Sequence, residues 1–365
     1  MKILDRQAVV AHRARAQGLH GGSDLGVLDL GLQDAPAGSA GHALAVRTGD
    51  PDAGDSPDLV RVLGIRGAPH VHRRRDLPGL RRELRPRSAE ELLGWLAGHA
   101  PAFAASGVDG LAVLDQTVTL LRERFPGETA TKGELSAAIS PALPAPARPW
   151  CVSCQAEHVI ENLFRLATLL AGLELERGDR RLVFRAPREP VEPDGTPPDG
   201  ALLRGFTRYA GPLRFGDASD WLSGTASNAP QPRGWAEIFD ELTPVRIDGT
   251  EYRMATDDLE NGALPPVLLL PPRDPYLTGN RSFVVPDRNI AKQVWKAQVS
   301  PGTLLVDGEI CGVWRQRISG RTISVTVTSS GRQHRGVRGA VNDQAELLAA
   351  VRGGSALEPE VVWEG

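Results

Sequence analysis

The sequence predicts an α+β fold that is mainly α, in which three tandem winged helix-turn-helix units are followed by a small C-terminal β domain. A helix, a short helix, a longer helix and a hairpin follow one another over residues 110–185, and the same order recurs over residues 201–254. From Ala263 the pattern changes to short strands. The expected divisions are therefore 1–100, 101–190, 200–262 and 263–365.

Length and composition describe a soluble globular chain. It has 365 residues, more than one typical core, with 41% hydrophobic and 24% charged residues. No apolar run of about eighteen residues is present, so we expect no membrane helix, and the N-terminus lacks the apolar region of a signal peptide. Three cysteines, an odd number, argue against a disulfide framework and for the cytoplasm. A net charge of −3, taken alone, argues against a nucleic-acid partner.

The first unit fits the repeated order less cleanly than the other two. Residues 3–17 are expected to form an amphipathic helix that buries Ile3, Leu4, Val9 and Val10. Residues 59–71 then supply the extended, wing-like part. The similarity between the units is one of element order and not of sequence.

The stretch Leu28–Arg47, LDLGLQDAPAGSAGHALAVR, is the most informative part of this unit. A short apolar run ends at Gln33 and Asp34, a turn follows at Pro36 and Gly38, and a small-residue helix comes after it. An amide at this place is either a turn residue bonded to its own backbone or a positioned functional group. The residues themselves leave both interpretations open.

A basic segment follows directly. Residues 61–87 hold nine arginines against two acidic residues, and they also contain His70 and His72 on one face of an extended segment. The segment is either a solvated helix face at Asp76–Arg85 or a surface that contacts phosphates. We favour the phosphate surface because the charge lies beside the Gln33 stretch. The arginines expected to contact DNA are Arg61, Arg66, Arg73, Arg74 and Arg75.

Local signals place the elements of the second and third units. Ser88 and Thr129 or Thr131 are candidate helix caps, and Asp248-Gly249 is a typical hairpin turn. A second hairpin is expected to turn at Arg177-Gly178-Asp179. The expected helices are 88–96, 110–125, 131–139, 155–171, 201–209, 215–222 and 232–242, and the expected hairpins are 173–185 and 245–254.

The C-terminal region has the pattern of a β domain. Gly302–Arg315 is expected to form a hairpin that turns at Asp307-Gly308, and Arg321–Thr328 alternates like a strand. Asn342–Arg352 is expected to be a helix.

Cys151-x-x-Cys154-x-x-x-His158 is the only spacing that suggests a metal site. A structural zinc site needs four ligands, and Cys311 is far away in sequence. We therefore expect two reduced thiols and a helix histidine, with no metal and no other cofactor, although the spacing leaves metal binding open.

Four segments together resemble the AlkZ/YcaQ family of DNA glycosylases, which are winged helix DNA-binding proteins. They are LGLQDAPAGSAGHALAVR, LVRVLGIRGAPHVHRRRDL, LPPVLLLPPRDPYLTGNRS and VDGEICGVWRQR. The resemblance implies three winged helices and a β domain arranged as a C around duplex DNA. It also implies a monomer that repairs alkylated or crosslinked DNA by hydrolysing N-glycosidic bonds, in the cytoplasm at the nucleoid.

In that family a signature of Gln, an apolar residue, then Gln or Asp carries the chemistry. Gln33 falls on its first position, whereas Asp34 and Ala35 follow, so the acidic group stands one residue early. The resemblance implies that Gln33 orients a water or the sugar and that Asp34 supports the developing sugar cation. Asp34 is also a candidate cap for the next helix, and we favour this role over the catalytic one.

The remaining site predictions concern histidines and aromatic residues. His42, His70 and His72 are candidate contacts to phosphates or to a lesion. The aromatic content of 5% predicts no platform on which a flipped base stacks. Two functional classes stay open, a DNA glycosylase and a non-catalytic DNA-binding protein that acts as a regulator or lesion binder.

Overall fold

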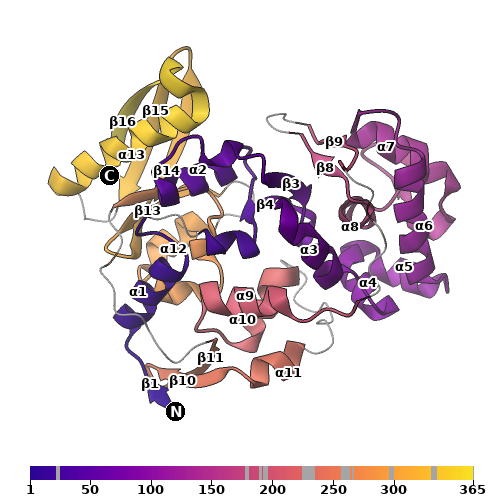
Figure 1. The fold of residues 1–365 in the computed structure, drawn as a ribbon, viewed down its shortest axis with the longest axis horizontal. Coiled ribbons are helices and arrows are strands. Elements are labelled where there is room, and N and C mark those ends of the chain that lie inside the picture. Colours follow the sequence, from indigo (N-terminus) through magenta and orange to yellow (C-terminus); the bar gives the residue numbers. More distant parts are fainter. Residues whose placement is uncertain are drawn as a thin grey trace.

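The computed structural model describes residues 1–21, 25–176, 181–188, 191, 196–223, 235–255, 264, 267–295, 300–329 and 335–364. The chain folds as α+β and is mainly helical, as the sequence predicts (Figure 1). No helix in these ranges is both long enough and apolar enough to cross a bilayer. The turn predicted at 177–179 lies outside the described residues.

The first sheet carries the Gln33 stretch. Its strands are antiparallel in the order β2-β4-β3, so the last strand of the three lies in the middle. Hydrophobic residues of β3 pack with those of a helix in the third unit in one shared core. The elements are α1 (Arg6–Ala16), β2 (Leu32–Gln33), α2 (Ser39–Thr48), β3 (Leu59–Leu63), β4 (Pro69–Arg73) and α3 (Leu77–Leu84).

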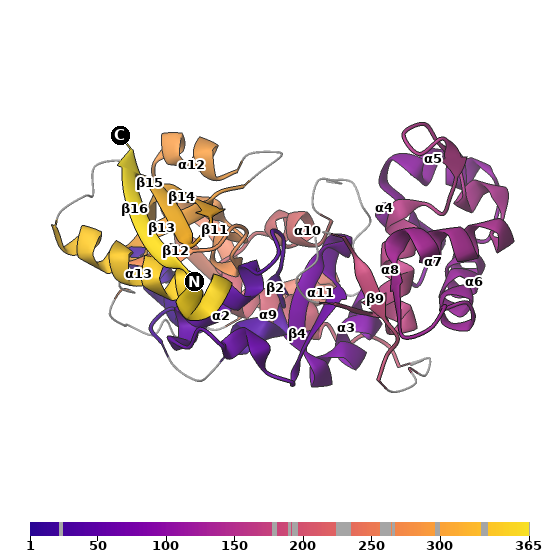
Figure 2. The same ribbon diagram turned by 90° about the horizontal axis from the view of Figure 1, so that it is seen from above.

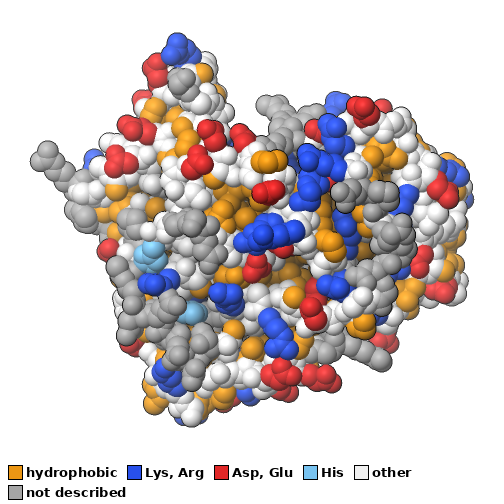
Figure 3. All heavy atoms as spheres, viewed as in Figure 1, with side chains coloured by type: hydrophobic (Ala, Val, Ile, Leu, Met, Phe, Trp, Pro, Cys, Tyr) orange, Lys and Arg blue, Asp and Glu red, His pale blue; other side chains and the backbone are white. Residues whose placement is uncertain are grey.

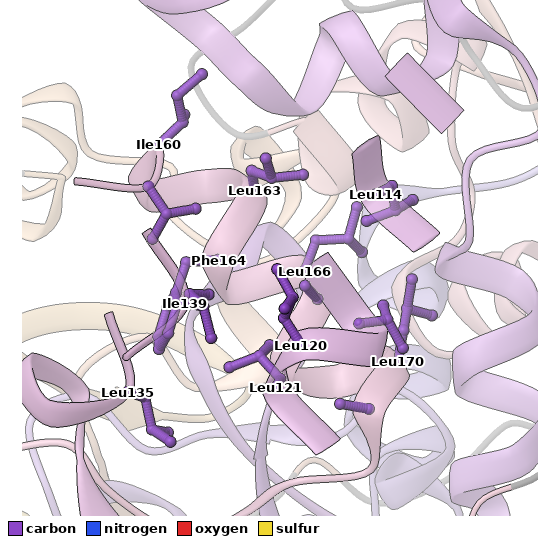
Figure 4. Close-up of a cluster of buried hydrophobic side chains, with 14 of the residues drawn as sticks. Leu114, Leu120, Leu121, Leu135, Ile139, Ile160, Leu163, Phe164, Leu166 and Leu170 are labelled. Atoms are coloured by element: carbon purple, nitrogen blue, oxygen red, sulfur yellow. The ribbon is translucent and has the colours of Figure 1, made fainter. Parts of the chain in front are cut away.

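The second sheet repeats this order as β5-β9-β8. Three helices cover it and bury a cluster of leucine, isoleucine and phenylalanine side chains (Figure 4). Of the two caps considered for α7, the structure has Thr131, which forms a capping box with Glu134. The elements are α6 (Gly110–Glu123), β5 (Thr129–Thr131), α7 (Lys132–Ile139), α8 (Glu161–Ala171), β8 (Glu174–Leu175) and β9 (Val183–Arg185).

The third sheet has the same arrangement in reduced form. Leu213 bridges to Arg253 of β11, which pairs with β10, and β1 adds to β10 in parallel. The turn predicted at Asp248-Gly249 is confirmed, since both residues have positive φ. The elements are β1 (Lys2–Ile3), α9 (Ala201–Ala210), α10 (Phe215–Ser223), α11 (Trp235–Asp240), β10 (Thr243–Ile247) and β11 (Thr250–Met254).

The C-terminal region forms a five-stranded sheet in the order β12-β13-β14-β15-β16. The hairpin that turns at Asp307-Gly308 is confirmed, and so is the helix near the end of the chain. The last strand runs parallel to β15 and was not predicted. The elements are β12 (Leu268–Leu270), α12 (Arg288–Val294), β13 (Gly302–Val306), β14 (Glu309–Ser319), β15 (Thr322–Ser329), α13 (Arg335–Gly353) and β16 (Glu358–Glu364).

Two local predictions were wrong. The N-terminal helix begins at Arg6, and Ile3 is 79% exposed because it lies in the edge strand β1. The helix expected from Gln155 begins at Glu161, because a small hairpin of β6 (Trp150–Cys151) and β7 (Ala156–Glu157) precedes it. Ser88 caps α4 (Ala89–Leu96) as predicted, and α5 (Ala100–Ala105) follows that helix.

Buried arginines join the N-terminal helices to the C-terminal region. Arg47 of α2 forms a two-bond ion pair with Asp274, at 2.8 and 2.9 Å, and both side chains are fully buried. Arg13 of α1 donates to the carbonyls of Tyr276 and Asn280. Figure 2 shows the result, with α12 on one side, α4 and α5 on the other, and α10 between them.

Candidate functional site

A cleft of about 850 Å³ lies where these parts meet. The residues that line it come from β2, β4 and the turn before β4, the end of α4, the start of α8, α10, the segment between β12 and α12, and the end of α12 with the residues that follow it. The cleft therefore combines the Gln33 stretch with residues more than two hundred positions later in the chain. Gln33, Arg66 and His70 are the predicted site residues that it contains.

Gln33 is held in a defined orientation at this cleft. It pairs with His70 across strands β2 and β4, so the two side chains lie on the same face of the sheet. Its Oε1 accepts a hydrogen bond of 3.1 Å from Arg66 Nη2. Arg66 has a φ of +58° in the turn between β3 and β4. Burial, with Arg273 and Arg281 nearby, lowers the pKa of Arg66 to about 10.

His70 is neutral at pH 7. Burial lowers its pKa to about 4, although a 2.9 Å hydrogen bond between Nδ1 and the Ala68 carbonyl opposes the shift. Because that carbonyl can only accept, Nδ1 carries the proton and Nε2 is an acceptor. His72 lies further inside, where a Cβ on Gly31 would come within 2.2 Å of its ring. The structure thus places His72 in the scaffold behind the cleft.

Asp34 points away from Gln33. It is 6% exposed and accepts a 3.0 Å hydrogen bond from the backbone N–H of Ala40, in the first turn of α2. Its other oxygen forms an ion pair with Arg61, whose Nη1 donates to the Glu176 carbonyl at 2.8 Å. Asp34 does not line the cleft. Asp34 thus satisfies a first-turn N–H of α2, as favoured from the sequence, although the N-cap residue itself is Gly38 and an arginine is added.

The basic segment divides into two parts. Arg66 lines the cleft, whereas Arg73, Arg74 and Arg75 do not. Arg73 bonds to Asp29 at 2.7 Å, Arg74 forms an ion pair with a glutamate of β8, and Arg75 is 80% exposed. In Figure 2, α3, which follows these residues, lies at the lower edge, whereas α12 lies at the upper edge. Figure 3 shows the face that carries β4 and α3, where basic and acidic side chains are mixed.

His42 lies in the interior. It is fully buried on α2, and its ring centroid is 5.5 Å from that of Trp314 in an edge-to-face arrangement. Burial, together with Arg352 and Arg47, lowers its pKa to about 3. Neither ring nitrogen has a hydrogen-bond partner within the described residues. His42 therefore does not reach a surface where DNA could contact it.

The sequence reasoning did not single out two arginines of the cleft. Arg273 and Arg281 lie close enough to Arg66 to lower its pKa, and Arg281 lies 4.6 Å from the ring centroid of Trp295. Asp217 and Asp220, one turn apart on α10, face Arg281 across the cleft. Both arginines belong to the segment LPPRDPYLTGNRS, so the resemblance was the one signal that pointed to them.

The cleft contains more aromatic residues than the composition suggested. Trp95, Trp221 and Trp295 all line the cleft, although aromatic residues make up only 5% of the chain. Trp221 itself stacks on Phe206 with a centroid distance of 4.2 Å. Composition misled here because folding gathers three of the seven tryptophans at one place. Flat apolar rings beside cations suit a site that receives a base.

Side chains of the type that bind metals form one group within the described residues. It consists of Cys151, Cys154 and His158 at the β6–β7 hairpin, and none of the three lines the cleft.

Comparisons with known proteins agree with this architecture. A family model described as DNA glycosylase AlkZ-like matches residues 24–351. Among solved structures, the Streptomyces sahachiroi DNA glycosylase AlkZ matches with a TM-score of 0.71 and 21% identity, over 99% of this chain and 100% of that one. No curated protein matches the sequence significantly. The structural match indicates a shared fold, and the family match covers most of the chain.

Proposed function

Because the chain belongs to the AlkZ-like DNA glycosylase family, we propose that it hydrolyses the N-glycosidic bond of an alkylated base in duplex DNA. The observation that carries the proposal is the position of Gln33. It lines a cleft of about 850 Å³ with its carbonyl oxygen fixed by Arg66, so the amide Nε2 is left to donate to a ligand. Gln33 stands opposite His70, whose Nε2 accepts.

In the proposed reaction the bond between C1′ and the base nitrogen breaks, and its electron pair leaves with the base. An alkylated purine already carries positive charge, so it departs as a neutral molecule. Gln33 Nε2 donates to a water, whose proton passes toward His70 Nε2 while its oxygen bonds to C1′. Asp217 and Asp220 supply negative charge across the cleft for the developing sugar cation.

For DNA binding we propose Arg66, Arg273 and Arg281 as the phosphate contacts inside the cleft. Two of the sheets share the strand order first-third-second, and the isolated bridge from Leu213 to β11 gives the third unit the same order, which supports an assignment of each unit as a winged helix-turn-helix. We propose that a monomer encloses the duplex as a C, because one chain supplies the residues of the cleft. Arg75 is a candidate DNA contact outside the cleft. We no longer propose the other predicted contacts, because acidic partners engage them or because they are buried: Arg61, Arg73, Arg74, His42 and His72.

A second function, DNA binding without catalysis, has one observation in its favour. Asp34, the carboxylate nearest to Gln33 in sequence, caps α2 and pairs with Arg61, so it does not face the cleft. If Asp217 and Asp220 do not support the sugar cation, the cleft would recognise a lesion without removing it.

The test compares two glutamine variants in a base-release assay on duplex DNA that carries N7-methylated purines. Gln33→Ala should lower the release rate by on the order of 100-fold or more, because it removes a group that positions the water. Gln116→Ala, on α6 and bonded only to the Ala142 carbonyl within the described residues, is the matched control and should retain the wild-type rate.

Release by Gln33→Ala at the wild-type rate would refute the assigned role of this residue. A wild-type protein that binds alkylated duplexes and releases no base from any of them would establish the second function instead.

A further inference from the structure

We propose that Cys151, Cys154 and His158 bind a zinc ion on the β6–β7 hairpin and that a water completes the coordination. From the spacing alone we expected two reduced thiols and a helix histidine, because a fourth ligand is missing. The structure has a hairpin there instead, and this hairpin turns all three side chains toward one point.

The distances suit the ion. One ligand atom from each of the three residues lies within 4.8 Å of the other two. In a tetrahedral site with zinc–sulfur bonds of about 2.3 Å, two sulfur ligands are separated by roughly 3.7 Å. The distances between the three ligand atoms must therefore shorten by about 1 Å at most when zinc binds. Cys154 is exposed and the other two side chains are half-buried, so rotation of the side chains suffices.

Two of the three proposed ligands, His158 and Cys151, have hydrogen-bond partners of the kind that orient a metal ligand. His158 Nδ1 lies 2.9 Å from the Val159 carbonyl, which fixes the proton on Nδ1 and leaves Nε2 for the metal. The Cys151 sulfur lies 3.1 Å from the Ser153 hydroxyl, which can donate to it. A hydroxyl donor of this kind supports a thiolate ligand, which is the form that binds zinc.

The backbone conformation of the turn keeps the two cysteines together. Gln155, directly after Cys154, has a φ of +52°, an uncommon conformation for a residue with a side chain. This conformation reverses the chain at once, so the two cysteines lie at one end of the hairpin. Its side chain holds the turn by donating to the Val152 carbonyl at 2.6 Å.

The hairpin has little else to stabilise it. Each strand has two residues, and Trp150 and Val152 are 58% and 76% exposed, so the hairpin buries little apolar surface. Isolated two-stranded hairpins are marginal in water. An ion pair between Arg148 and Glu157 spans its base, but exposed pairs contribute little. A bound zinc would fix the hairpin directly.

The position of the hairpin gives the ion a role near the cleft. The hairpin leads into α8, where Asn162 lines the cleft and Arg165 donates to the Gly67 carbonyl at 2.8 Å. Gly67 follows Arg66, which holds Gln33. The zinc would thus fix the start of α8 next to the turn that orients the cleft. Two thiolates and an imidazole select zinc over magnesium or calcium.

The test measures metal in the full-length protein, purified in reductant and without chelators. Elemental analysis should find about one zinc per chain, and cobalt(II) added to the zinc-free protein should give thiolate-to-cobalt charge-transfer absorption. Cys154→Ser and His158→Ala should each weaken zinc binding by at least about tenfold. Cys311→Ser, at a buried cysteine of β14, is the matched control and should retain the metal.

The wild-type measurement decides the question even if a variant does not fold. Zinc below about a tenth of an equivalent, together with no charge-transfer band on cobalt titration of the reduced protein, would overturn the proposal. Zinc content and spectrum are independent of base release, so this result stands apart from the glycosylase assay.

Discussion

Replacement of His42 by leucine should leave the free energy of unfolding at pH 7 unchanged or raise it. The variant should also lose less stability than the wild type when the pH is lowered. His42 is fully buried against Trp314, and its two ring nitrogens lack partners within the described residues. Leucine has a similar volume and no polar atoms, so it removes two unsatisfied groups without a large cavity.

The magnitude follows from the difference in pKa between the two states. Unfolded His42 has a pKa near 6.5, and burial lowers it to about 3 in the folded protein. Between these values the unfolded state binds a proton that the folded state excludes, so stability falls as the pH falls. The slope is about 1.4 kcal/mol per pH unit, which gives about 2 kcal/mol at pH 5. His70 and His72, with pKa values lowered to about 4 and about 3, act in the same direction.

The assay is urea unfolding of the wild type and His42→Leu at pH 7, 6 and 5. The variant should exceed the wild type by about 2 kcal/mol more at pH 5 than at pH 7, and it should bind duplex DNA equally well. Parallel pH profiles for the two proteins would refute the reasoning, since they would mean that His42 takes up its proton in the folded state. A loss of DNA affinity would restore His42 as a contact.

Three further predictions address the arginines and the helix caps. Arg281→Ala should flatten the log–log salt dependence of duplex binding by roughly 0.9, whereas Arg321→Ala, at an exposed arginine outside the cleft that pairs with Glu358, should leave the slope unchanged; equal slopes for both variants would contradict the proposed cleft contacts. Asp34→Ala should lower the free energy of unfolding by about 3 kcal/mol, because it removes the partner of Arg61 as well as a cap; a loss under about 1 kcal/mol in urea would mean that the pair contributes nothing. Thr131→Ala should cost about 1 kcal/mol, measured by thermal unfolding, and an unchanged midpoint would argue against the capping box.

Elements with strong local signals could be predicted from the sequence. The hairpin at Asp248-Gly249 and the cap at Thr131 depend on backbone chemistry within four residues, and both are present. The strand β16 (Glu358–Glu364) was missed because it forms an exposed edge and lacks an apolar alternation. The start of α8 was misplaced because pairing of Trp150 with Glu157 overrides the local helix pattern.

The candidate site was only partly accessible to the same reasoning. Gln33 could be found because an amide at the end of an apolar run stands out, and its likeness to a family signature strengthened the choice. Arg273 and Arg281 could not be ranked above the other arginines, because charge counts do not distinguish a guanidinium held by a carboxylate from one that faces a cleft. Arg73 and Arg74 show this. They lie at the end of β4 that is away from the cleft, and each forms an ion pair with an acidic residue, Asp29 or Glu174.

Buried arginines explain why the Gln33 stretch cannot act as an isolated motif. A buried guanidinium is destabilising unless its donors are satisfied, so Arg13 and Arg47 fix whatever satisfies them. Arg47 pairs with Asp274, which is 227 positions away, and the two terminal nitrogens of Arg13 donate to the carbonyls of Asn280 and Tyr276. The segment held in this way carries the arginines of the cleft. The helix that follows Gln33 therefore holds the segment that forms the opposite wall of the cleft. The site forms only when the C-terminal region is folded against this helix.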